Sequence, residues 1–348
     1  MPMKPTEIEN LLSGTLIFLA GWVISMLMQP FAIWLSPLLG LLDHPEERKV
    51  HTSVVPRAGG VAIWVSISIC ITAYVFFFPN LSQGMTDLIL PALAVLALAA
   101  LGLIDDLRPL PWWPRLIVHF GCATLVLFFA EKEISGILLL PAIFIIALIT
   151  NAFNLIDNMD QQSGGVGLLL VLGLIYLGLD KTLLVEDSIT FVVLPCLAGT
   201  LIGFLWWNRP PAKIFLGDGG SIPLGFFLAW LVLHILSSLG LENAWRWMAL
   251  PALFFIPLYD LISVVLIRLS QGRSPFKPDR QHLSHRLESR GFSRKRAVSI
   301  ILLLQYAGIM IGLGILTVDD FFKGLAVFSW LILAIIALVS AEFRSRPA

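Results

Sequence analysis

The segment DLILPALAVLALAALGLIDD, residues 87–106, decides the fold of this chain. It carries no charge between Asp87 and the pair Asp105-Asp106. A membrane-spanning helix needs about 20 predominantly apolar residues, and this segment approaches that length. We therefore expect a transmembrane helix that ends in two adjacent carboxylates.

Similar apolar segments recur along the whole chain, at 11–38, 59–78, 115–130, 134–151, 164–179, 188–206, 222–240, 247–267, 297–317 and 323–341. Of the 348 residues, 57% are hydrophobic and 13% are charged, whereas soluble domains carry about 25% charged residues. The sequence therefore predicts an all-α, polytopic transmembrane bundle of eleven spans in one domain, 1–348. Because several segments are short or broken by glycine and proline, a count of ten stays open.

Positive charge is distributed unevenly between the two sets of loops. If the loop at 40–58 is cytoplasmic, 18 of the 23 Lys and Arg residues lie on the cytoplasmic side. This bias predicts a protein of the cytoplasmic (inner) membrane. We expect its N-terminus on the outer side and its C-terminus in the cytoplasm. The net charge of zero excludes a globally basic nucleic-acid binder. The three cysteines lie in apolar segments without the spacing of a zinc site or a disulfide framework.

Two carboxylate motifs end predicted spans. The adjacent charges of Asp105 and Asp106 raise each other's pKa unless a metal or substrate cation neutralises them, although both could instead cap a helix end in the headgroup region. Asn151, Asn154 and Asp157 are three residues apart, with Asp160 continuing the series, and share one polar helix face. Hydrogen bonding between helices is the alternative for this second motif.

A glycine-rich motif lies between two spans and runs from Asn208 through Lys213 and Asp218 to Ser221. Its glycines allow close approach of the backbone to a ligand, Lys213 can bind a phosphate, and Asp218 offers the hard oxygen that Mg²⁺ prefers. The motif is not a P-loop, since it lacks the Gly-Lys-Ser/Thr ending. A plain turn is the alternative interpretation.

The basic loop 268–296 carries His282, His285 and Arg286. Two histidines three residues apart could face one zinc ion, but no thiol or third histidine stands beside them. Among so many arginines they are better explained as phosphate contacts, with an ordinary positively charged loop as the alternative. Asp260 lies within the ninth span, where buried hydrogen bonding and a substrate role are both open.

The first loop supplies the basic residues Lys49, His51 and Arg57 before Gly59-Gly60. All these motifs fall on the cytoplasmic side, in loops near 40–60, 105–115, 152–165, 207–221 and 269–296. Carboxylates, a divalent cation and several phosphate-binding bases at one face are the equipment of phosphoryl transfer.

These motifs together resemble the polyprenyl-phosphate N-acetylhexosamine-1-phosphate transferases, glycosyltransferase family 4, which includes the phospho-MurNAc-pentapeptide translocase. Arg57 and the shortened histidine motif resemble the initiating GlcNAc-1-phosphate transferase branch. The chain departs from the family pattern at Asp160-Gln161-Gln162, which bears on sugar choice, and at Ser284, which replaces a histidine.

The resemblance implies transfer of a sugar 1-phosphate from a UDP-N-acetylhexosamine to undecaprenyl phosphate at the membrane, with release of UMP and with Mg²⁺ (or Mn²⁺) as cofactor. The expected catalytic residues are Asp105, Asp106, Asp157 and Asp218, of which Asp218 and Asp157 bind the metal and Asp105 meets the lipid phosphate. The expected substrate-binding residues are Lys49, His51, Arg57, Asn151, Asn154, Asn208, Lys213, His282, His285 and Arg286, the last three at the diphosphate.

Two other classes of protein also fit intramembrane carboxylates. The first is a transporter or flippase for a lipid-linked or anionic solute, although transporters place such residues at the midplane or in repeated halves. The second is a non-catalytic scaffold of a glycan-assembly complex. The expected partners are the two substrates and the bilayer, with a homodimer left open and nucleic acid excluded.

Overall fold

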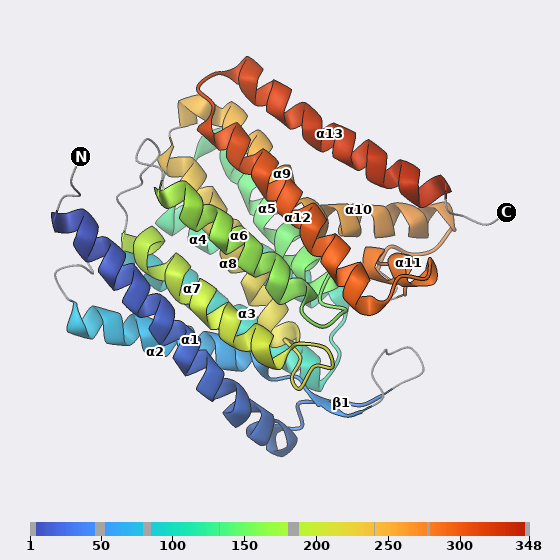
Figure 1. Ribbon diagram of the computed structural model, residues 1–348, viewed down its shortest axis with the longest axis horizontal. Coiled ribbons are helices and arrows are strands. Elements are labelled where there is room, and N and C mark those ends of the chain that lie inside the picture. Colours follow the sequence, from blue (N-terminus) through green and yellow to red (C-terminus); the bar gives the residue numbers. More distant parts are fainter. Residues whose placement is uncertain are drawn as a thin grey trace.

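The computed structural model describes residues 5–45, 53–78, 85–131, 133–179, 188–239, 241–276 and 279–344. Figure 1 shows a bundle of helices with a small strand pair at one end. The long helices are α1 (Pro5–Leu39), α2 (Gly59–Phe77), α3 (Ile89–Leu107), α4 (Trp112–Ala130), α5 (Leu139–Leu155), α6 (Gln162–Leu179), α7 (Ser188–Trp207), α8 (Asp218–Ser238), α10 (Phe255–Ser270), α12 (Arg294–Thr317) and α13 (Phe321–Arg344). The short elements are η1 (Met85–Leu88), η2 (Gly136–Leu138), η3 (Leu241–Met248), α9 (Ala249–Leu253), α11 (Leu283–Ser289), β1 (Leu42–Asp43) and β2 (Val55–Pro56).

Within the described residues, each apolar segment expected from the sequence is mostly helical. Among the described residues, eight helices are long and apolar enough to cross a membrane, and the bent pair Trp245–Leu253 and Phe255–Ser270 makes up to nine. Gln162–Gly178 and Phe191–Trp207 are shorter apolar helices. The expectation of an all-α polytopic membrane protein is confirmed.

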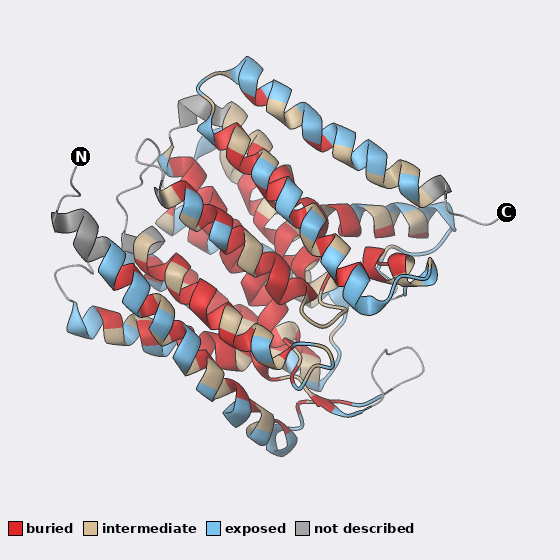
Figure 2. Ribbon diagram, viewed as in Figure 1, coloured by how far each residue is buried: buried red, intermediate tan, exposed pale blue. Residues whose placement is uncertain are grey.

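Helix α8 lies at the centre of the bundle. Of the residues in its most apolar 18-residue stretch, 94% are buried. Helices α3 and α5 pack along it, whereas α13 lies at the edge and is exposed over most of its length (Figure 2). Because α8 is hydrophobic all round, it can only be stable inside such a bundle. Its first residue, Asp218, is therefore fixed in place by the whole core.

Two glycines let the helices converge around the start of α8. A Cβ atom on Gly60 would lie 2.2 Å from the Cα of Gly220, and one on Gly102 would lie 2.2 Å from the carbonyl oxygen of Asp218. Real Cβ atoms do not approach heavy atoms this closely, so α2 and α3 can touch α8 here only through glycine. This close approach brings the polar ends of three helices together.

The far end of α8 is held by a buried carboxylate. Glu131, just after α4, is 4% exposed and accepts hydrogen bonds from the indole N–H of Trp230 (2.8 Å) and from Ser237 (3.3 Å). Its Oε1 also lies 2.8 Å from Nδ1 of His234. These contacts fix α4 against the end of α8 that is remote from Asp218.

The segment 247–267, expected as one span, is broken at Phe254, where α9 and α10 meet at 75°. Gln305 of α12 compensates for the break: its Oε1 accepts from the backbone N–H of Ile256 (3.0 Å) and its Nε2 donates to the carbonyl of Leu253 (2.7 Å). A broken helix inside a membrane protein needs such partners for its freed backbone groups. The break therefore changes the direction of the chain between α9 and α10.

Candidate active site

Asp105 and Asp106 end α3, and their side chains point to different partners. Asp105 binds Arg115 (2.6 Å to Oδ2) and accepts from the backbone N–H of Leu110 (2.5 Å), which fixes the turn between α3 and α4. Asp106 accepts from the N–H of Gly219 (3.1 Å), so it caps the start of α8. Adjacent residues on a helix face different directions, which explains the division between the two carboxylates.

Asp218, the first residue of α8, lies where α3, α5 and α8 meet. Its Oδ1 accepts a hydrogen bond from Asn154 (2.7 Å), which also donates to Ser221 (3.2 Å). Its Oδ2 lies 3.8 Å from Arg115, and 30% of the side chain is exposed. Asp218 is therefore held on one side and open on the other, as a ligand for a cation must be.

Asp157 lies in the turn after α5, close to the same point. Burial raises the pKa of Asp157 to about 8, and the nearby charge of Asp106 adds to the shift, while Arg57 and a backbone hydrogen bond from Gly217 oppose it. A carboxylate that resists ionisation in this way is stabilised by an added cation. We name Asp105, Asp106, Asp157 and Asp218 the carboxylate centre.

The donor atoms of the carboxylate centre suit Mg²⁺, which prefers hard oxygen ligands and is usually bound by one or two carboxylates together with substrate phosphates. In the described ranges, no group of three or more His, Cys, Asp or Glu side chains is arranged so that it could hold a metal ion by itself. A metal ion at the carboxylate centre would therefore need further ligands, such as the oxygens of a phosphate substrate.

Arg57 borders the carboxylate centre on the side of the strand pair. Its guanidinium binds Asp43 (2.6 Å) and lies 3.6 Å from Asp106. Strands β1 and β2 pair Leu42 with Pro56, which sets Arg57 beside Asp43. The expected residues Lys49 and His51 lie outside the described residues.

The glycine-rich loop joins this border through its backbone. Phe215 donates its N–H to Pro56 (2.7 Å) and accepts from Gly59 (3.0 Å). Asn208 is 5% exposed and uses both side-chain groups internally, accepting from the N–H of Gln161 (2.6 Å) and donating to the carbonyl of Ile214 (2.7 Å). Asn208 therefore shapes the loop and has little left for a substrate.

Lys213 and Asn151 were also expected at the site. Lys213 is exposed, with its ammonium 5.2 Å from the centre of the Trp207 ring, so it remains accessible to an anion. Asp160 accepts from the N–H of Ala212 (3.1 Å), which ties the turn after α5 to the Lys213 loop. Asn151 is half-buried on α5, one turn before Asn154.

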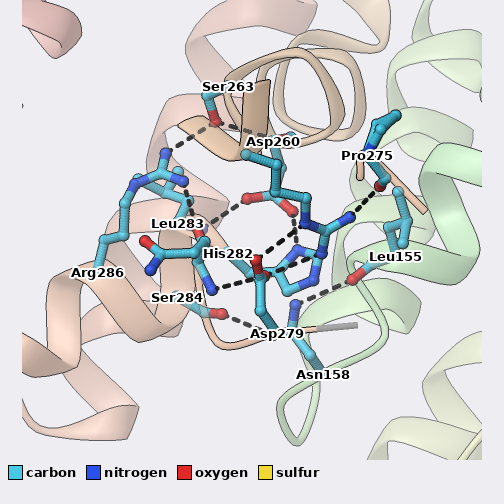
Figure 3. Close-up of polar contacts among 12 residues, drawn as sticks. Leu155, Asn158, Asp260, Ser263, Pro275, Asp279, His282, Leu283, Ser284 and Arg286 are labelled. Carbon is cyan, nitrogen blue, oxygen red and sulfur yellow. Dashed lines mark hydrogen bonds and ion pairs between the residues drawn. The ribbon is translucent and has the colours of Figure 1, made fainter. Parts of the chain in front are cut away.

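The histidine segment, residues 279–289, is held by α10. Asp260 is 1% exposed; its Oδ2 lies 2.7 Å from Nδ1 of His282, and its Oδ1 accepts from the N–H of Leu283 (2.5 Å), as Figure 3 shows. Arg268 binds Asp279 through two hydrogen bonds, of 2.9 and 3.0 Å. The bond at Nδ1 leaves Nε2 of His282 for a ligand.

The histidine segment is connected to the turn that carries Asp157. Ser284, the residue in place of a family histidine, donates to Oδ1 of Asn158 (2.6 Å), and Asn158 donates in turn to the carbonyl of Leu155 (3.0 Å). The departure from the family pattern at position 284 therefore makes a structural contact. Figure 3 shows this link below the Asp260–His282 pair.

His285 and Arg286 point to protein partners. Nδ1 of His285 lies 3.3 Å from Glu288, and burial lowers the pKa of His285. Arg286 binds Glu342 of α13 (3.0 Å) and donates to Ser263 (2.9 Å). Sequence reasoning did not find Glu342, and it left Arg115 as a general cytoplasmic charge.

Comparisons with known proteins find a family and several relatives of similar sequence. The sequence model described as glycosyl transferase family 4 matches residues 88–236, which include the whole carboxylate centre. The chain is 27% identical to a Bacillus subtilis (strain 168) protein named probable undecaprenyl-phosphate N-acetylglucosaminyl 1-phosphate transferase, over 86% of this chain and 84% of the relative.

Two further relatives have related names. A Mycobacterium tuberculosis (strain ATCC 25618 / H37Rv) protein named decaprenyl-phosphate N-acetylglucosaminephosphotransferase is 28% identical, over 87% of this chain and 80% of its own. A Salmonella typhi protein named undecaprenyl-phosphate alpha-N-acetylglucosaminyl 1-phosphate transferase is 28% identical, over 89% of this chain and 83% of its own. The similarity in each case extends over most of both chains.

Proposed function

We propose that this chain, whose residues 88–236 match glycosyl transferase family 4, transfers N-acetylglucosamine 1-phosphate from UDP-N-acetylglucosamine to undecaprenyl phosphate. The observation that carries this proposal is the meeting of Asp106, Asp157 and Asp218, from three separate segments, at the start of α8. The names of the relatives suggest the substrates. The geometry suggests where the negative charges of two phosphates could be neutralised together.

In the proposed reaction, an oxygen of the acceptor phosphate attacks the β-phosphorus of the donor. The bond from that phosphorus to the bridging oxygen of the α-phosphate breaks, UMP leaves, and the sugar keeps its anomeric configuration because no bond to C1 changes. A phosphate monoester is already ionised near pH 7, so a direct displacement needs little base catalysis. Positioning and neutralisation of charge then supply most of the rate.

Each charged group has a role in this proposal. Asp218 and Asp157 would hold Mg²⁺, which neutralises the negative charge of the transferred phosphate. Arg115, held by Asp105 at 2.6 Å and lying 3.8 Å from Asp218, would meet the acceptor phosphate. Lys213, which is exposed, and His282, whose Nδ1 lies 2.7 Å from Asp260, would bind the donor diphosphate.

Donor labelled with ³²P at the β-phosphate tests the reaction directly. With purified protein, undecaprenyl phosphate and Mg²⁺, the label should enter the lipid product while unlabelled UMP is released. Release of labelled UDP would indicate an ordinary glycosyltransferase and would overturn the proposal. A panel of other UDP-N-acetylhexosamines in the same assay tests the choice of sugar.

The proposal also places the carboxylate centre on the cytoplasmic face, where UDP-sugars are found. Cysteine labelling at Arg57, Lys213 and His285 should occur from the cytoplasm, and labelling at Asp320 from outside. The three native cysteines are buried, so they add little background. Labelling of Arg57 and His285 from opposite sides would contradict a single site.

A further inference from the structure

Glu342, near the end of α13, connects its own helix to α10 and α11. It accepts hydrogen bonds from Tyr259 of α10 (2.9 Å) and from Nε of Arg286 in α11 (3.0 Å). Its backbone carbonyl accepts from Arg290 (2.8 Å). Only 13% of the Glu342 side chain is exposed, so these bonds are largely shielded, although Glu342 and Arg286 line a cavity.

Arg286 uses most of its N–H donors in this network. Its Nε and Nη2 reach the two oxygens of Glu342 at 3.0 and 3.3 Å, Nη2 also donates to Ser263 (2.9 Å), and Nη1 donates to the carbonyl of Gln281. An arginine has five N–H donors, and these contacts use four. A residue bound in this way is committed to the protein rather than free to bind a diphosphate.

The helix that carries Arg286 depends on such contacts. Helix α11 has seven residues, Leu283–Ser289, and an isolated helix shorter than about 12 residues is marginal in water. Asp260 binds the residues at its start, His282 and Leu283, while Glu342 binds Arg286 one turn later. Only 11% of the residues in the most apolar 18-residue stretch of α13 are buried. The contact of this helix with Arg286 comes from Glu342 in its last turn.

We propose that Glu342 positions the histidine segment through Arg286, and that Arg286 is a positioning residue and not a contact of the donor diphosphate. This inference rests on the proposed function, because it assigns how the donor-binding histidines of that same site are held. It gives α13 a specific role: its end fixes α11 against α10.

A double-mutant cycle of Arg286→Gln and Glu342→Gln tests the inference. Each single variant should raise the KM for the UDP-sugar by about tenfold, with kcat changed much less, and the double variant should be no worse than either single one. If Arg286 instead contacts the diphosphate, Arg286→Gln will exceed Glu342→Gln by far and the two effects will add. That result, or unchanged KM values in both variants, overturns the inference.

Two further variants guard against a trivial outcome. Removing one partner of a buried ion pair can prevent folding, so Tyr259→Phe removes a single hydrogen bond to Glu342 and leaves every charge paired; it should raise the same KM by a smaller factor. Lys323→Gln removes the partner of Asp319 at the exposed start of α13 (2.6 Å) and should leave all kinetic constants unchanged.

Hydrogen exchange provides a readout that needs no activity. In Glu342→Gln, the amides of residues 283–289 should exchange at least about tenfold faster than in the wild type, while those of α8 should be unaffected. Faster exchange in a protein that releases no UMP would sustain the inference and refute the proposed function alone. Unchanged exchange in residues 283–289 would refute the inference even if the enzyme is active.

Discussion

The carboxylate centre and the histidine segment balance their charges in different ways. In the carboxylate centre, four aspartates share the guanidiniums of Arg57 and Arg115 within the described part of the chain, and Arg57 is also bound to Asp43. Carboxyl groups therefore outnumber guanidinium groups at the start of α8. Protonation of a carboxyl group or a bound cation relieves the repulsion in such a cluster, and the proposed Mg²⁺ would be such a cation.

The histidine segment is balanced by the protein itself. Its acidic side chains each have a basic or imidazole partner: Asp279 has Arg268, Asp260 has His282, and Glu342 has both Arg286 and Arg290. These pairs are largely buried, so each fixes an orientation. Under the proposed function, the first region would provide the charge for chemistry, whereas the second would provide a frame for the two imidazoles.

The largest effect should come from neutralising the open carboxylate. Asp218→Asn keeps the shape of the side chain but removes the charge that would hold Mg²⁺, so we expect a loss of transfer on the order of a thousandfold. UMP release at saturating Mg²⁺ measures it. Asp319→Asn, the same change at a residue whose side chain is 79% exposed, serves as the control. Activity of Asp218→Asn within about threefold of the wild type would show that the charge imbalance has no catalytic purpose.

A smaller effect should follow from breaking the frame at Asp260. Asp260→Asn removes the charged partner of His282, so we expect the KM for the UDP-sugar to rise on the order of tenfold. His282→Gln should give a similar KM, and the double variant should not be worse than His282→Gln. Full activity of Asp260→Asn, together with an inactive His282→Gln, would mean that His282 is held by other groups.

Replacing Asn208 tests whether this residue binds the substrate, as the sequence predicts, or instead stabilises the loop. Asn208→Ala leaves the N–H of Gln161 and the carbonyl of Ile214 without their partner, and unsatisfied buried groups cost about 1–3 kcal/mol each. We expect a lower thermal unfolding temperature with kcat near the wild-type value for the protein that remains folded. A large rise in KM with unchanged stability would restore Asn208 to substrate binding.

The sequence predicted the helices well because hydropathy is a local property. It could not predict the bend at Phe254, since the groups that complete the broken backbone come from Gln305, 49 residues beyond Ile256. Pro251 and Pro257 marked the region without indicating where the helix turns. Local patterns therefore identified each span but not the partners that shape it.

The candidate site was predictable to the extent that its chemistry is carried by residue type. Asp157 was identified from its three-residue spacing with Asn151 and Asn154, and Asp218 from the glycine-rich motif in which it offers a hard oxygen ligand. The role of Arg286 was not predictable, because its partner Glu342 lies 56 residues away and the loop sequence is equally basic whether its arginines bind substrate or protein. Tertiary contacts alone distinguish these two uses of the same charge.

The smallest effect should come from an ion pair of the histidine region that is not buried. Arg294 binds Glu288 (2.9 Å), but 53% of its side chain is exposed, and exposed pairs contribute about 0–1 kcal/mol because water and salt screen them. Glu288 also keeps its contact with His285 when Arg294 is replaced. Arg294→Gln should therefore leave KM and kcat within about twofold of the wild type and change unfolding by less than about 0.5 kcal/mol. A tenfold rise in KM would mean that the number of charges near the histidines matters more than their burial, and the distinction between a buried frame and its surface would fail.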